Sequence, residues 1–208
     1  VEDALEHLTL RPEDRVVDLG CGGGELLLRL VERFGVSAVG VDHAADALER
    51  VREQAAQRVP DRTVETLCCS VGELSGWDEL GCVACVGGPR VADTVDTHLA
   101  KLATWLRPGG ALVVGEGFWC REPDPAYLEA TGIPRDDLPL RDELAALVAQ
   151  SGLEERFWWT AERSDWDRFE STLLENWRAR AAACSDDAAL AETLAAKERF
   201  HAAQERWG

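Results

Sequence analysis

The amino-acid sequence predicts an open α/β fold, in which a doubly wound, mostly parallel sheet has helices on both faces and a helical extension at the C-terminus. Two observations support this class. Short apolar runs alternate with longer amphipathic segments through the first two-thirds of the chain, as in repeated strand–helix–strand units. A glycine cluster joins the first apolar run to the first amphipathic segment. The 208 residues, 46% of them apolar, can bury a core without disulfides or metals.

The first part of the chain is expected to form five strands and three helices. Short apolar runs predict the strands, at residues 15–19, 36–41, 62–67, 82–86 and 111–115. Amphipathic segments predict the helices, at residues 24–34, 44–59 and 92–106. Pro60 is expected to end the second helix, and Pro108-Gly109-Gly110 the third.

Beyond residue 116 the pattern is less regular. Residues 117–140 contain four of the eight prolines and are expected to be irregular apart from a short turn at Tyr127. The elements expected after them are a helix at 140–151, a strand at 154–160, a long helix after Ser164-Asp165, a break at Ser185-Asp186-Asp187 and a last helix to Trp207. Because no repeat or linker divides the chain, we expect a single domain over residues 1–208.

Charge and hydropathy exclude several classes of protein. The chain has 39 acidic and 22 basic residues, for a formal net charge of -17, so neither nucleic acid nor an anionic membrane is expected as a partner. No apolar run approaches the ~20 residues of a membrane-spanning helix, and no basic-then-apolar leader is present, so we expect a soluble, cytoplasmic protein. The chain begins at Val1 and contains no methionine, so we expect both termini to be truncated or disordered.

The seven cysteines are odd in number and lack the spacing of a secreted disulfide scaffold. Side chains one or three residues apart on a strand point to opposite faces, so neither Cys68-Cys69 nor the pair Cys82 and Cys85 can chelate a metal alone. The four histidines are scattered without ligand spacing. We therefore expect reduced thiols, several of them small buried residues, and no metal site. Soft-metal chemistry at the thiols is the alternative.

The most informative segment is the glycine cluster after the first strand. Asp18, Gly20, Gly22 and Gly24 form a D-x-G-x-G-x-G pattern between a strand and a helix. Glycines at such a junction let a ligand approach the backbone closely. The dinucleotide pattern G-x-G-x-x-G, counted from Gly20, would need a third glycine where Glu25 stands. A carboxylate two residues before the first glycine suits a cofactor that carries an ammonium and a sulfonium, and it disfavours a pyrophosphate.

This pattern resembles the first motif of the class I S-adenosylmethionine (SAM)-dependent methyltransferases, which have a Rossmann-like fold. Later segments resemble a mostly uncharacterised bacterial subgroup of small-molecule methyltransferases: CVACVGG (82–88), LRPGG (106–110), GEGFW (115–119), SDWDRFE (164–170) and RWG (206–208). The resemblance covers about residue 10 to the end of the chain. It implies SAM as cofactor, S-adenosylhomocysteine (SAH) as its product, a cofactor half at about 1–116 and a substrate half at about 117–208.

The resemblance also implies which residues would hold SAM. The residues expected at its methionine end are Asp18, Gly20, Cys21, Gly22 and Gly24. Asp42, at the end of the second strand, would accept hydrogen bonds from the ribose hydroxyls. A cap for the following helix is the alternative for Asp42, and the two roles are compatible. The remaining expected contacts are His43 at the cofactor rim, Ser70 and Val71 near adenine, and Val86. Ser70 stands where the family often has Asp or Asn.

Acceptor chemistry is expected just after the fourth and fifth strands, because open α/β sheets bind ligands beyond the carboxyl ends of their strands. Gly87 and Gly88 would contact the acceptor there. Glu116 would act as a base or orient the acceptor, and a helix cap or an exposed loop charge is the alternative. Trp119 and Tyr127 would line the acceptor pocket, or else pack the irregular segment.

The long helix after Asp165 has an apolar stripe at helical spacing, from Trp166 to Trp177. Glu170 falls within this stripe, where a carboxylate is out of place on a simple core face. We expect Glu170 to serve catalysis and Trp166 to contact the substrate. Pairing of Glu170 with Arg168 or Arg141 is the alternative.

These observations predict a methyltransferase that transfers a methyl group from SAM to a small, uncharged or cationic molecule by in-line displacement. Two other functions remain open. Ser70 keeps a non-catalytic SAM-binding or interaction protein as an alternative, and a nicotinamide-dependent oxidoreductase is disfavoured by Glu25. Seven of the eight tryptophans lie at or beyond residue 105, and a tryptophan-rich face there would suit a homodimer contact.

Overall fold

The computed structural model describes residues 2–184 and 187–207. Ser185 and Asp186 of the expected break, and Gly208 of the terminal motif, lie outside the described residues. The chain forms two compact units. The first unit comprises Val1–Phe118 and Pro139–Phe157, and the second comprises Trp119–Leu138 and Trp158–Gly208.

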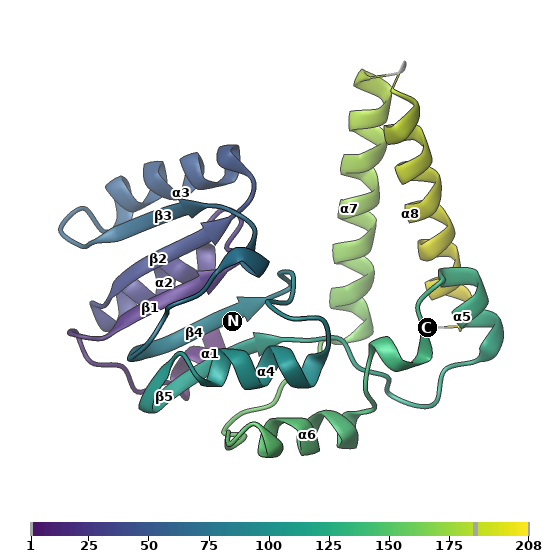
Figure 1. The fold of residues 1–208 in the computed structure, drawn as a ribbon. Coiled ribbons are helices and arrows are strands. Elements are labelled where there is room, and N and C mark those ends of the chain that lie inside the picture. Colours follow the sequence, from purple (N-terminus) through teal and green to yellow (C-terminus); the bar gives the residue numbers. More distant parts are fainter. Residues whose placement is uncertain (1, 185–186, 208) are drawn as a thin grey trace. The chain divides into compact units, whose positions relative to one another are not determined.

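The first unit contains a five-stranded parallel sheet, drawn as arrows in Figure 1. Its strands are β1 (Arg15–Leu19), β2 (Ser37–Asp42), β3 (Val64–Cys68), β4 (Leu80–Val86) and β5 (Leu106–Gly115). They lie in the order β3-β2-β1-β4-β5. The chain therefore runs outward from β1 through β2 to β3 and then returns to the other side of β1. This arrangement confirms the predicted doubly wound, Rossmann-like fold and places a topological switch point between β1 and β4.

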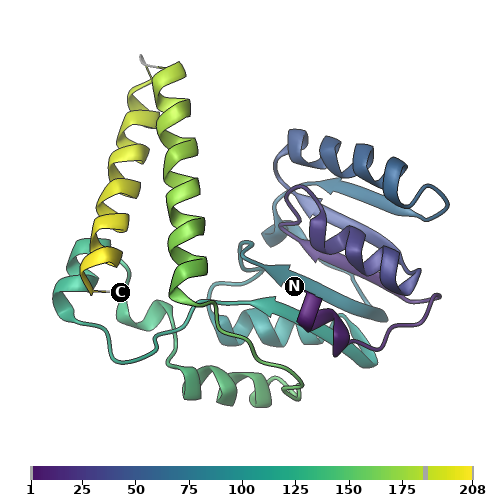
Figure 2. The same cartoon turned by 180° about the vertical axis from the view of Figure 1, so that it is seen from behind.

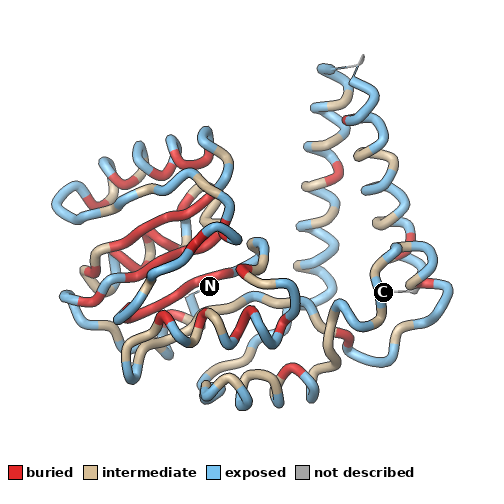
Figure 3. Tube along the Cα trace, viewed as in Figure 1, coloured by how far each residue is buried: buried red, intermediate tan, exposed pale blue. Residues whose placement is uncertain are grey.

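Helices cover both faces of this sheet, as Figure 2 shows from behind. The first face is covered by α1 (Glu2–Glu6), α2 (Glu25–Phe34) and α3 (Ala45–Arg58), and the second by the short helix η1 (Val71–Glu73) and α4 (Val95–Ala103). Neighbouring residues of β1 show the alternation, because Val16 packs on the first face and Val17 on the second. Both faces are thus apolar, and the buried residues lie on the central strands β1, β2 and β4 and on the helices that cover them (Figure 3).

The boundary between α4 and β5 differs from the prediction. The structure has strand from Leu106 onward, through the Pro108-Gly109-Gly110 segment that was expected to end a helix. The register shifts between the pair Leu80–Leu106 and the pair Cys82–Ala111, so this segment forms an irregularity in the strand. An edge strand tolerates proline and glycine there, because β4 is the one described strand that pairs with β5. At its other end, α4 begins at Val95 because Thr94 forms a capping box with Thr97.

The strand predicted at residues 154–160 is wrong, since no strand forms there in the described part of the chain. A strand needs a neighbour to receive its backbone hydrogen bonds, and this segment pairs with none of β1 to β5. Side-chain contacts hold its first part instead. The Phe157 ring stacks on His7 with centroids 4.5 Å apart, and Glu155 pairs at 3.0 Å with Arg141 of α6 (Arg141–Gln150).

The second unit is helical. It contains α5 (Pro125–Thr131), a short helix η2 (Arg135–Asp137), α7 (Arg163–Ala183) and α8 (Ala188–Trp207). The last helix packs on both α5 and α7, with Leu174, Leu190 and Ala203 buried. Trp166 and Phe169 are exposed, so the apolar stripe of α7 is not buried along its whole length. Of the helices described, none is long and apolar enough to cross a membrane.

One buried ion pair links the chain before β1 to the edge strand β5. The Asp14 carboxylate accepts hydrogen bonds from Nε and Nη2 of Arg107, both at 2.7 Å, and from the backbone N–H of Arg11 at 2.8 Å. Arg107 holds the pKa of Asp14 below its ordinary value, against the opposing effect of burial. The pair thus joins the start of the central strand to the sheet edge.

We predict that Asp14→Asn lowers the free energy of unfolding by about 2–4 kcal/mol at neutral pH, because Arg107 is left without its charged partner. A carboxyl whose pKa is lower in the folded than in the unfolded state stabilises the fold at pH values above the ordinary Asp pKa. This stabilisation is lost as the pH falls through the pKa of the folded state. The difference from the parent should therefore shrink in acid. Urea denaturation at about pH 7 and about pH 3 measures it.

Asp46→Asn is the matched control, because Asp46 forms an exposed pair with Arg50 and its loss should cost less than about 1 kcal/mol. Equal losses at both pH values for Asp14→Asn, or a loss no larger than that of the control, would contradict the stabilising role of the buried pair.

Candidate functional site

The carboxyl edge of the sheet brings together most of the residues expected at the site. The glycine cluster follows β1, Asp42 ends β2, Ser70 follows β3, and Gly87 and Glu116 follow β4 and β5. Because all five strands are parallel, these positions share one edge of the sheet. The switch point between β1 and β4 lies on this edge, where ligands bind in folds of this class.

The glycine cluster divides into positions that pack and positions that are open. A Cβ on Gly20 would lie 2.9 Å from the Cα of Gly88, and a Cβ on Gly24 would lie 2.8 Å from the side chain of Val51. Gly22 and Gly23 have no neighbouring atom within 4 Å of such a Cβ. Gly22 also has a φ of 51°, which favours glycine. The middle of the loop is therefore bare backbone that a ligand can approach.

Asp42 connects this loop to the start of α3. Its Oδ2 accepts a hydrogen bond from the backbone N–H of Gly22, and its Oδ1 accepts one from Ala44, both at 2.9 Å. The contact with Ala44 closes a turn just before α3, whose N-cap residue is Ala44 and has no side-chain cap, so Asp42 is not the cap considered as its alternative role. Each oxygen retains a second lone pair for a hydroxyl of a ligand. His43 is 84% exposed, with Nδ1 3.5 Å from Asp42 Oδ1, at the rim of the loop.

Asp18 lies below the loop and is 3% exposed. Burial raises its pKa to about 7, the negative charge of Asp42 adds to this rise, and the backbone N–H of Leu27 opposes it. A cation bound nearby would favour the ionised form of Asp18. Two buried carboxylates beside open glycines suit an ammonium group and ribose hydroxyls. The residues present thus fit SAM.

The other residues expected at the cofactor lie around this loop. Burial raises the pKa of the Cys21 thiol to about 12, which makes it a poor nucleophile. After β3, Ser70 is exposed, and Val71, the first residue of η1, is buried. Val86, the last residue of β4, is exposed. Cys82 and Cys85 are buried in β4, as expected of small core residues, whereas Cys68 is exposed.

Glu116 forms an ion pair with Arg90, a residue for which the sequence carries no signal. Arg90 Nη2 lies 2.7 Å from Glu116 Oε1, and Arg90 Nε lies 3.2 and 3.3 Å from the two carboxylate oxygens. The two side chains are only 19% and 12% exposed. Glu116 is therefore a largely buried, paired carboxylate, and neither a helix cap nor an exposed loop charge.

The remaining predicted residues belong to the second unit. Trp119 is buried, donates from Nε1 to the Arg135 carbonyl at 3.0 Å, and meets the Tyr127 ring edge to face at 5.9 Å. The Tyr127 hydroxyl accepts from Gln204 at 2.8 Å. These contacts pack the irregular segment, as in the alternative considered for it. Burial, followed by the charge of half-buried Glu170, raises the pKa of Tyr127.

Trp166, predicted to contact substrate, is exposed, and its ring lies 5.8 Å from that of Phe169. Arg168, one of the two partners considered for Glu170, pairs with Asp165 at 2.8 Å. Arg141 pairs with Glu155. Within residues 2–184 and 187–207, no group of three or more His, Cys, Asp or Glu side chains is arranged to hold a metal ion.

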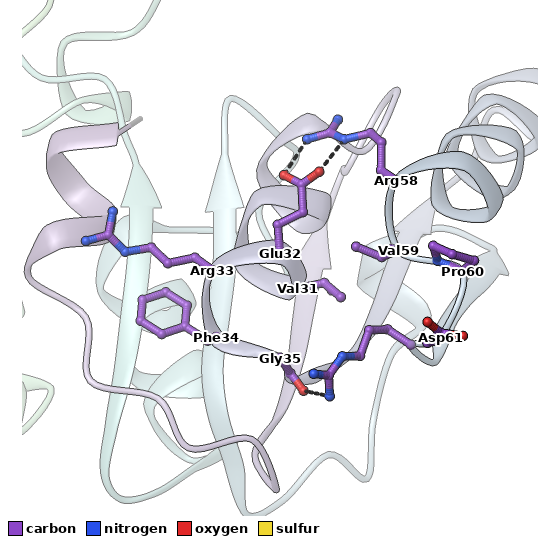
Figure 4. Close-up of a pocket in the computed structure, with 10 residues that line it drawn as sticks. Val31, Glu32, Arg33, Phe34, Gly35, Arg58, Val59, Pro60 and Asp61 are labelled. Carbon is purple, nitrogen blue, oxygen red and sulfur yellow. Dashed lines mark hydrogen bonds and ion pairs between the residues drawn. The ribbon is translucent and has the colours of Figure 1, made fainter.

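A cavity of about 450 Å³ lies elsewhere, at the ends of α2 and α3 (Figure 4). Both helices end there before the next strand begins, so it belongs to the amino edge of the sheet. Two of its arginines are engaged by the protein itself: Arg58 pairs with Glu32 at 2.7 Å, and Arg62 donates to the Gly35 carbonyl at 3.0 Å. These contacts complete the helix ends, and the cavity is separate from the glycine loop.

Comparison with known proteins gives consistent results. Residues 16–110 match the family model of a methyltransferase domain. The structure is similar to that of a SAM-dependent methyltransferase from Geobacter sulfurreducens in complex with SAH, with a TM-score of 0.85 and 26% identity over 99% of this chain and 84% of that one. The uncharacterised protein YjhP of Escherichia coli is 25% identical over 190 residues, which are 90% of this chain and 77% of YjhP.

A third relative is similar only in part. Geranyl diphosphate 2-C-methyltransferase of Streptomyces lasalocidi is 32% identical over 121 residues. These residues make up 57% of this chain and 40% of that enzyme.

The raised pKa of Asp18 predicts an unusual dependence of stability on pH. Between the ordinary Asp value and about pH 7 the folded state binds the proton more tightly than the unfolded state, so stability falls as pH rises through this range. Asn cannot ionise. We predict that the free energy of unfolding of Asp18→Asn, measured relative to that of the parent, rises by roughly 2–4 kcal/mol as the pH is raised from about 4 to about 8. Urea denaturation across this range measures the difference.

The Asp14→Asn variant provides the control, because its loss relative to the parent should stay constant between about pH 4 and about pH 8 and should shrink only below the ordinary Asp pKa. A difference between Asp18→Asn and the parent that is constant with pH would show that Asp18 is ionised throughout.

Proposed function

Because the chain belongs to the class I SAM-dependent methyltransferases, with SAM as its cofactor, we propose that it transfers the methyl group to a small-molecule acceptor. One observation carries the proposal. The open glycine backbone lies between two buried carboxylates at the switch point of the sheet, and this arrangement suits a cationic cofactor with a ribose. When bound, SAM supplies a methyl group on a sulfonium for in-line displacement.

The proposed roles in binding follow from these contacts. Asp18 would face the ammonium of the methionine end, which would lie along Gly20, Cys21, Gly22 and Gly24. Asp42 would accept from the ribose hydroxyls while it holds the loop through Gly22. The contacts proposed around the ribose and adenine are His43, Ser70, Val71 and Val86.

For the acceptor, we assign orientation rather than proton removal to Glu116. Its carboxylate is held by three contacts with Arg90, and these fix the direction in which its oxygens can accept hydrogen bonds from an acceptor molecule. Gly87 and Gly88 would border the acceptor on the β4 side. In the second unit, Trp119, Tyr127, Trp166 and Glu170 remain proposed acceptor residues.

The choice of a small molecule has two supports. The relative from Streptomyces lasalocidi acts, by its name, on geranyl diphosphate. The net charge of -17 disfavours nucleic acid as acceptor and anionic membranes as partners.

A cytoplasmic location stays part of the proposal. The exposed rings of Trp166 and Phe169 would suit the homodimer contact expected from the sequence.

Calorimetric titration with SAM, SAH and NADH tests the cofactor site. We predict saturable binding of SAM and SAH, and none of NADH. Asp42→Ala should weaken binding of both by about 1–3 kcal/mol, because it removes a charged hydrogen-bond acceptor and releases Gly22. His43→Ala, a change at the exposed neighbour, should have a much smaller effect. Binding that is equally strong in both variants would contradict the placement of the ribose at Asp42.

Screening small molecules for SAM-dependent release of SAH tests the transfer itself, and the acceptor found then tests Glu116. Because Gln keeps an oxygen that accepts hydrogen bonds, Glu116→Gln should lower kcat/KM by about tenfold and Glu116→Ala by about a hundredfold. SAH affinity measured by calorimetry should change little in either. If Glu116→Gln and Glu116→Ala lose kcat to the same extent, and by more than about a hundredfold, the result would assign proton removal to Glu116 instead.

A further inference from the structure

The loop that follows β4, residues 87–91, is held by three side chains that contact its backbone. His98 Nδ1 accepts a hydrogen bond from the Val91 N–H at 3.1 Å, and Lys101 Nζ donates to the Val91 carbonyl at 3.1 Å. Both residues lie on α4. From β4, the Cys85 thiol contacts the Pro89 carbonyl at 3.8 Å. The last residue of the loop is thus fixed at both its N–H and its carbonyl.

This loop touches the cofactor side and the acceptor side of the proposed site. A Cβ on Gly88 would lie 2.6 Å from the Leu19 carbonyl, and a Cβ on Gly20 would lie 2.9 Å from the Cα of Gly88, so the two loops are in tight contact. Two residues further on, Arg90 holds Glu116. A shift of the loop would therefore disturb the glycine cluster and Glu116 together.

The contact with Val91 determines which tautomer the neutral His98 ring adopts. Because Nδ1 accepts an N–H, the neutral ring carries its proton on Nε2. His98 is 1% exposed, and its Nε2 has no hydrogen-bond partner among the described residues. Burial lowers the pKa of His98; the charge of Glu116 opposes this effect and that of Arg90 adds to it. Lys101 is a further positive group on the same helix.

We propose that His98 is a positioning residue of the methyltransferase site: its neutral ring holds the 87–91 loop against the glycine cluster, and protonation of the ring releases the loop and weakens cofactor binding. The physical reason is that a protonated ring has two N–H donors and no acceptor, so the bond from Val91 is lost. This inference rests on the placement of SAM proposed above.

The test compares SAH affinity in the parent, His98→Asn and His98→Leu by calorimetry at about pH 7.5 and about pH 5.5. Asn offers an amide oxygen near the position of Nδ1 and does not titrate in this range. We expect Leu to lose affinity by about tenfold at both pH values and Asn to stay within about threefold of the parent at pH 7.5. On acidification the parent should lose more affinity than Asn. Asp18 is present in all three proteins, so its titration cancels when the SAH affinity of each variant is divided by that of the parent at the same pH.

Nitrogen NMR of histidine-labelled protein gives a readout that needs no cofactor. The chain has four histidines, and the resonances absent from the His98→Asn spectrum belong to His98. We expect a neutral ring at neutral pH, with the proton on Nε2. A proton on Nδ1, or a His98→Leu variant that binds SAH as tightly as the parent, would overturn the inference.

Two further outcomes are distinguished by the same design. If the parent fails to bind SAH, the cofactor placement fails, and the NMR measurement still decides whether His98 accepts from Val91. If His98→Leu does not fold, Lys101→Met removes the other contact of α4 with Val91 and should weaken SAH binding severalfold. Unchanged affinity in that variant would contradict a role for α4 in holding the loop.

Discussion

Two carboxylates buried at the carboxyl edge of the sheet are the constraint on which the rest of the site depends. Burying a charge is costly unless it is paired or hydrogen-bonded. For Asp42 the cost is offset by the backbone N–H groups of Gly22 and Ala44. Asp18 is accommodated differently, through a pKa raised to about 7. The protein therefore maintains a region that is ready to receive a positive charge, which is the character of a SAM site.

The topology of the sheet creates the space for this region. The chain leaves β1 in one direction and returns on its other side as β4, so the loops after these neighbouring strands meet at Gly20 and Gly88. Larger residues at either position would push the loops apart. The same arrangement places Arg90 beside Glu116. The groups proposed to bind the cofactor and to face the acceptor in the first unit are thus linked through one short loop, residues 87–91, which contacts α4.

The sequence predicted the features that depend on local pattern. The central strands β1, β2 and β4 appear as apolar runs because both of their faces are buried, and Asp18 and Asp42 are proposed as cofactor residues from their positions relative to the glycine cluster. Features that depend on tertiary partners were missed. The 154–160 segment has the residue types of a strand but no neighbour to pair with, and β5 starts early because an edge strand tolerates the irregularity at Pro108.

The same reasoning explains why the sequence carries no signal for two residues that contact the proposed site. Arg90 pairs with a carboxylate 26 residues away, and His98 binds a backbone group, so neither produces a recognisable spacing.

The most direct test of the account is a crystal structure of the SAH complex. We expect the ribose hydroxyls within hydrogen-bond distance of Asp42, the amino group of the methionine end directed toward Asp18, and the ligand in contact with the bare backbone at Gly22 and Gly23. SAH bound away from the carboxyl ends of β1 and β2, or bound there without contact to Asp42, would contradict the account.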